Sequence, residues 1–129
     1  MSLYLQSLGW WNLVGSVLIF FFLNEKIGNA ILVKWGGLFK EEFTHNFYSR
    51  LWICWAAGMN IFFALVNIYS PIWNVQELMN FIVYFDIISY SIFVFLVIRT
   101  LVNKTAGVGM YLALLIFLVW IGWGISTLL

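Results

Sequence analysis

Asp86 is the residue most suited to a chemical role, because it is the one acidic side chain deep inside a long apolar segment. An ionised carboxylate is costly in hydrocarbon, so Asp86 must face the interior of a helical bundle or carry a proton. Ser89 and Tyr90 follow at i+3 and i+4, the spacing that places side chains on one helix face. No lysine or arginine lies deep in an apolar segment to neutralise Asp86. These features favour binding of a cation or cycling of a proton.

Two other apolar segments carry polar and small residues at helical spacing. One stripe comprises Gln6, Gly9, Asn12 and Ser16, and the other comprises Ala56, Asn60, Ala64 and Asn67. Counting the helical rise from the segment ends places Asn12 and Asn60 near the depth of Asp86. We therefore predict a midplane ligand-binding pocket formed by Asp86, Asn60, Asn12, Ser16, Ser89 and Tyr90. The alternative is that these groups only form hydrogen bonds between helices, which Asn and Ser side chains commonly do in membranes.

Other chemistry finds little support in the sequence. Glu42 and His45 form a Glu-x-x-His pair and are the candidate metal ligands, but a di-iron bundle needs two such pairs and two further carboxylates. The single cysteine, Cys54, excludes an internal disulfide and any CxxC motif. No glycine-rich phosphate loop and no Ser, His and acid arrangement is present. We predict no catalytic residues and no cofactor, and we lean against an enzyme.

The composition indicates that lipid is the solvent for most of the chain. The 129 residues are 64% hydrophobic and only 9% charged, whereas soluble domains contain roughly 25% charged residues. The mean hydropathy is +1.00. A formal net charge of +1, without a run of basic residues, argues against a nucleic-acid partner. The expected surroundings are the bilayer and other membrane subunits, including copies of the same chain.

Four segments are long enough to cross the membrane, since a hydrocarbon core of about 30 Å needs about 20 apolar residues in a helix. They are residues 3–23, 51–70, 78–98 and 107–128. We predict that Pro71 ends the second, because proline has no N–H to continue a helix. The first segment follows no basic stretch and is too long for a cleaved signal peptide. The prediction is an all-α membrane protein with one four-helix domain over residues 1–129.

The basic residues predict the orientation. All six lie between the first and second segments or between the third and fourth: Lys26, Lys34, Lys40, Arg50, Arg99 and Lys104. The positive-inside rule then places loops 24–50 and 99–106 in the cytoplasm and both termini outside. Within the first loop, apolar residues recur at helical spacing from Ile27 to Phe39, which predicts a short amphipathic helix at the interface. Gly36 and Gly37 should interrupt this helix.

The function predicted from these features is binding or transport of a small ligand or cation by an oligomer, centred on Asp86. A second hypothesis is a non-catalytic accessory subunit of a larger membrane complex. The length, the outside-outside topology and the long inner loop are also similar to those of the microsomal glutathione transferase-like (MAPEG) enzymes. That resemblance implies a lipid- or thiol-modifying enzyme, in which Arg50 and Glu41 or Glu42 would correspond to the family's arginines and glutamate. Small multidrug exporters are similar in having four short helices and one membrane carboxylate, which lies in their first helix.

Overall fold

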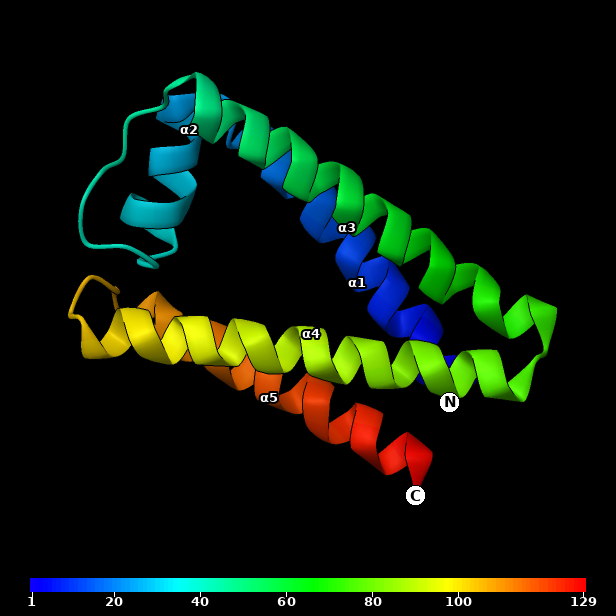
Figure 1. Ribbon diagram of the computed structural model, residues 1–129. Coiled ribbons are helices and arrows are strands. Elements are labelled where there is room, and N and C mark those ends of the chain that lie inside the picture. Colours follow the sequence, from blue (N-terminus) through cyan, green and yellow to red (C-terminus); the bar gives the residue numbers. More distant parts are fainter.

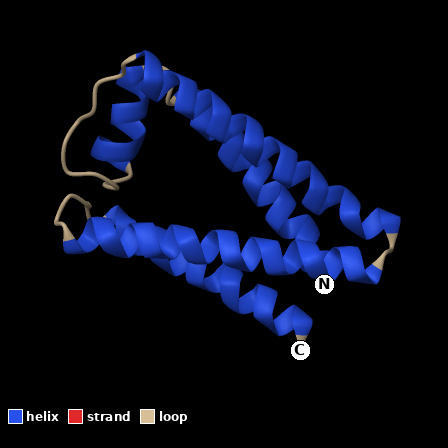
Figure 2. Ribbon diagram, in the orientation of Figure 1, coloured by secondary structure: helices blue, strands red, loops and turns tan.

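The computed structural model describes residues 1–129 and consists of helices joined by turns (Figures 1 and 2). The elements in chain order are α1 (Ser2–Phe21), α2 (Glu25–Asn29), the π-helix η1 (Ala30–Trp35), α3 (Phe47–Trp73), α4 (Gln76–Val102) and α5 (Gly109–Leu128). The only β-type pairing is an isolated bridge between Phe39 and Ala106. The all-α prediction is therefore confirmed.

Four of these helices are long and apolar enough to cross a membrane, namely α1, α3, α4 and α5. They coincide with the four predicted segments, but α3 and α4 are longer than predicted, at 27 residues each. At about 1.5 Å per residue, each of these two helices extends roughly 40 Å. That length exceeds the hydrocarbon core of a bilayer, which is about 30 Å thick.

The prediction that Pro71 ends the second segment is wrong. Helix α3 continues through Pro71 to Trp73 and ends at Asn74, whose φ of 52° is left-handed. Proline at this position removes the N–H that would bond to the carbonyl four residues earlier, which is that of Asn67. The Ser70 hydroxyl donates to the Asn67 carbonyl instead, at 3.3 Å. A neighbouring side chain thus compensates for the missing donor, and the helix persists for another turn.

The four long helices form two pairs, α1 with α3 and α4 with α5. The pairs converge near the N-terminus and the α3–α4 turn, and they diverge toward α2 (Figure 1). Gly9 makes the first pair possible, since a Cβ at this position would lie 2.8 Å from the Ala64 carbonyl oxygen and 3.0 Å from the Ile68 nitrogen. A small residue at the contact thus lets the backbones of α1 and α3 approach closely.

The main apolar core lies where the two pairs converge. It comprises seven buried side chains from α1 and α4: Tyr4, Leu5, Leu8, Met79, Ile82, Val83 and Tyr90. Trp120 and Trp123 of α5 pack against it, and both contact the Tyr4 ring edge-on. Helices α1 and α5 thus both pack against this core, at the end of the molecule where the two pairs converge.

At the diverging end, two loops join the pairs through backbone hydrogen bonds. The Gly107 N–H donates to the Leu38 carbonyl at 2.9 Å, and the Gly109 N–H donates to the Gly37 carbonyl at 2.8 Å. A Cβ at Gly107 or Gly109 would overlap the carbonyl oxygens of Gly37 or Gly36. The glycines are therefore required for the loops to approach each other.

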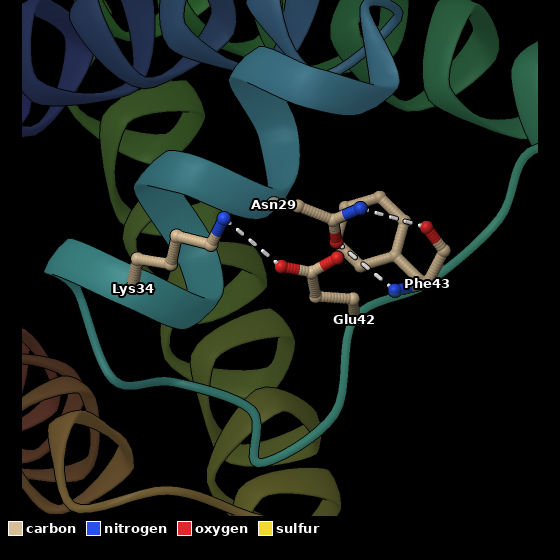
Figure 3. Close-up of polar contacts among 4 residues, drawn as sticks. All are labelled: Asn29, Lys34, Glu42 and Phe43. Atoms are coloured by element: carbon tan, nitrogen blue, oxygen red, sulfur yellow. Dashed lines mark hydrogen bonds and ion pairs between the residues drawn. The ribbon is translucent and has the colours of Figure 1, made fainter.

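The long first loop is helical over α2 and η1, and this helical part ends at Gly36, where the sequence predicts an interruption. The irregular segment that follows is fixed by Asn29, whose side chain donates to the Phe43 carbonyl at 2.8 Å and accepts from the Phe43 N–H at 2.9 Å (Figure 3). Lys34 and Glu42 form the one ion pair of the chain, at 3.1 Å (Figure 3). The loop is thus an ordered unit and not a plain linker.

Candidate functional site

Asp86 lies on α4 and is 4% exposed. Its Oδ1 accepts a hydrogen bond from the Asn67 side-chain amide of α3 at 3.3 Å. The same amide nitrogen also donates to the Phe63 carbonyl at 3.1 Å. Asn67 is 1% exposed, so this pair is enclosed by protein on both sides. The contact joins the two helix pairs near the α3–α4 turn.

Three buried polar oxygens around this pair have no hydrogen-bond partner: Asp86 Oδ2, Asn67 Oδ1 and Tyr4 Oη. Such atoms are uncommon, because each one carries a desolvation penalty of about 1–3 kcal/mol or more. Tyr4 belongs to the same buried apolar cluster as Tyr90. The amide oxygen and an ionised carboxylate can only accept hydrogen bonds. Asp86 Oδ2 and Asn67 Oδ1 are therefore two acceptors without a donor, and the Tyr4 hydroxyl, which could donate, forms no hydrogen bond with either of them.

A second group of hydrogen bonds is centred on Asn12 of α1. Its side-chain oxygen accepts from the Tyr90 hydroxyl of α4 at 2.7 Å. Its main-chain carbonyl accepts from the Asn60 amide of α3 at 3.2 Å and from the Ser16 hydroxyl at 2.7 Å. Asn12 thus connects three helices, and through Tyr90 it reaches the helix face that carries Asp86.

The structure brings most of the predicted pocket residues together, but in two groups. Asp86, Asn12, Ser16 and Tyr90 are buried. Asn60 is half-buried and bonds to Asn12 rather than to Asp86. Ser89 is half-buried and belongs to neither group of hydrogen bonds.

Sequence reasoning missed two members of the site, Asn67 and Tyr4. Asn67 belongs to the same polar stripe as Asn60, so the signal was present, but depth counting favoured Asn60. The two helix pairs diverge away from the α3–α4 turn (Figure 1). Asn67 is closer to that turn, so it reaches α4 while Asn60 remains against α1. Tyr4 gave no sequence signal beyond its aromatic ring near one end of an apolar segment.

The candidate metal ligands are directed to different partners. Glu42 pairs with Lys34. The His45 Nε2 contacts the Phe22 carbonyl at the end of α1, and its main-chain N–H donates to the Glu25 carboxylate at 2.9 Å. No group of three or more His, Cys, Asp or Glu side chains is placed to hold a metal ion. His45 and Glu25 connect the end of α1 with the start of α3.

No protein-family model matches the chain, and no curated protein or solved structure is detectably similar to it. The resemblances in length and topology to the MAPEG enzymes and to small multidrug exporters thus stay predictions. Arg50 is exposed near the start of α3, and Glu42 is engaged with Lys34 instead. The functional argument accordingly rests on the chemistry of the buried site.

Proposed function

We propose that the chain is a multi-pass integral membrane protein that reversibly binds a proton at Asp86, as part of binding or transporting a small ligand or cation. The observation that carries this proposal is the pair of buried, unpartnered oxygens on Asp86 and Asn67. Four helices with the length and apolar character of membrane spans support the membrane setting. In that setting, a carboxyl group inside the bundle is a functional candidate by default.

One proton would satisfy both orphaned oxygens. A protonated carboxyl has an O–H donor, which the ionised form lacks. Asn67 already donates to Asp86 Oδ1. A proton on Oδ2 would provide a donor for the Asn67 side-chain oxygen, so that the acid and the amide pair reciprocally. Loss of the proton leaves a buried anion held by a single amide, which favours uptake of another proton or of a small cation.

The proton uptake is tested by infrared spectroscopy of the reconstituted protein over a range of pH. A protonated carboxyl group has a C=O stretch that disappears on ionisation. We expect a band in the wild type that disappears as the pH is raised, and we expect this change to be absent from Asp86→Asn. Glu77→Gln is the matched control, since Glu77 is an exposed carboxylate in the first turn of the same helix. Identical pH-dependent spectra for the wild type and Asp86→Asn would contradict the proposal.

The proposed orientation has both termini outside and loops 24–50 and 99–106 in the cytoplasm. It rests on the positive-inside rule, because all six basic residues lie in or beside these two loops. The backbone pairing of Gly107 with Leu38 supports placing the two loops on the same side. The amphipathic helix of α2 and η1 would then lie at the inner interface.

Cysteine labelling in intact cells tests this orientation. Cys54 is exposed, so Cys54→Ala is the background for both variants. Ser2→Cys is expected to react with a membrane-impermeant thiol reagent, and Lys34→Cys only after the cells are permeabilised. The reverse pattern would show that the chain is inserted the other way round.

A second candidate function is that of an accessory subunit in a larger membrane assembly. The observation that favours it is α5, in which only Met110 and Gly124 are buried. The exposed face of α5 is open to lipid or to helices of other subunits, including copies of this chain, and it comprises Tyr111, Leu112, Leu115, Leu118 and Val119 among others. On this alternative, the hydrogen bonds of Asp86 and Asn12 serve only to hold the helices together. The behaviour of Asp86→Asn distinguishes the two candidates.

A further inference from the structure

An open pocket of about 470 Å³ lies where the two inner loops meet. Its walls are formed by residues of the first loop and of the α4–α5 loop: Phe39, Lys40, Glu41, Glu42, Phe43, Lys104 and Thr105. It is remote in sequence from Asp86 and contains none of the residues of that site. The pocket combines two cationic side chains with two aromatic rings.

The loop pairing brings the two lysines to one pocket. The Lys40 N–H donates to the Thr105 carbonyl at 3.4 Å, beside the bridge between Phe39 and Ala106. Lys104 has a left-handed φ of 57°, which turns the chain directly before Thr105. Because these constraints act on the backbone, both lysines are held at the pocket even while their long side chains move.

The charges at the pocket leave an excess of one positive charge. The Glu42 carboxylate is neutralised by Lys34. Lys40 and Lys104 form no ion pair, and Glu41 is the only other carboxylate of the pocket. Two free ammonium groups can donate to the oxygens of a phosphate, and the excess charge matches that of one phosphodiester.

We propose that this pocket binds a phosphate group, that of an anionic phospholipid headgroup. The pocket adjoins the ends of α4 and α5, at the level where headgroups would lie if these helices span the bilayer. Phe39 and Phe43 offer apolar surface to the first acyl carbons, and Glu41 can accept a hydrogen bond from a headgroup hydroxyl. Basic pockets between helices on the cytoplasmic side commonly bind anionic lipids.

Native mass spectrometry of the full chain tests this proposal, with phosphatidylglycerol, phosphatidylcholine and inorganic phosphate as separate probes. The test variant is Lys40→Gln combined with Lys104→Asn, because asparagine tolerates the left-handed backbone at position 104. The control variant, Lys26→Gln with Arg99→Gln, removes two exposed charges from the same side but outside the pocket. It controls for the general attraction of basic residues to anionic lipid.

We expect the wild type to retain phosphatidylglycerol in preference to phosphatidylcholine. The test variant should bind phosphatidylglycerol roughly 100-fold more weakly, since each lysine of the pocket would donate a charge-assisted hydrogen bond to the phosphate, which contributes about a factor of ten. The control variant should lose clearly less. Equal losses in both variants would overturn the proposal. Retention of inorganic phosphate by the wild type, without lipid preference, would assign the pocket to the free ion and overturn the lipid assignment.

Discussion

Replacing Gly9 with alanine is expected to destabilise the protein by about 1–3 kcal/mol, the usual range for overpacking a tightly packed interface. The added Cβ would lie 2.8 Å from the Ala64 carbonyl oxygen and 3.0 Å from the Ile68 nitrogen. Both are backbone atoms of α3, so no side-chain rotation can relieve the clash. The two helices must separate, and the hydrogen bond between Asn12 and Asn60 should weaken as a result.

Gly58→Ala is the matched control for this substitution. Gly58 lies on α3, and a Cβ at this position would meet nothing within 4 Å. Alanine is the better helix former, so this variant should be as stable as the wild type or slightly more stable. Unfolding midpoints in mixed detergent would be compared for the three proteins. Equal midpoints for the Gly9 and Gly58 variants would show that the α1–α3 contact is looser than described.

The helical elements could be predicted from sequence because their signals are local. About 20 consecutive, predominantly apolar residues specify a span, and each of the four segments is such a run. The i, i+4 relation of Asp86 and Tyr90 is also local, so their common helix face follows from spacing alone. The end of the helical part of the first loop is likewise determined locally, by Gly36 and Gly37.

The features that the sequence could not reveal depend on tertiary contacts. Pro71 indicates a helix end by itself, but Ser70 bonds to the carbonyl that proline leaves free. Asn67 rather than Asn60 bonds to Asp86, and this depends on the angle between the helix pairs, which no local pattern determines. The pairing of Gly107 and Gly109 with the first loop joins segments about 70 residues apart, and its only local sign is a pair of glycines.

The Asp86→Asn variant should lose the proposed function while keeping the fold. The amide preserves the shape and hydrogen-bonding capacity of the side chain but cannot ionise. Since it removes a potential buried charge, the variant should assemble as well as the wild type or better. Coupling to protons requires a group that gains and loses a proton. Asp86→Asn is therefore expected to lose all pH-dependent binding or uptake of solute.

Solute uptake by proteoliposomes, with and without a pH gradient, is the most direct test of this role for Asp86. Wild type, Asp86→Asn and the Glu77→Gln control would be compared across a panel of small cations and cationic amphiphiles. The account predicts pH-dependent binding or uptake of at least one solute by the wild type and the control, and none by Asp86→Asn. Identical behaviour of wild type and Asp86→Asn at every pH would contradict it and leave Asp86 as a structural residue of an accessory subunit.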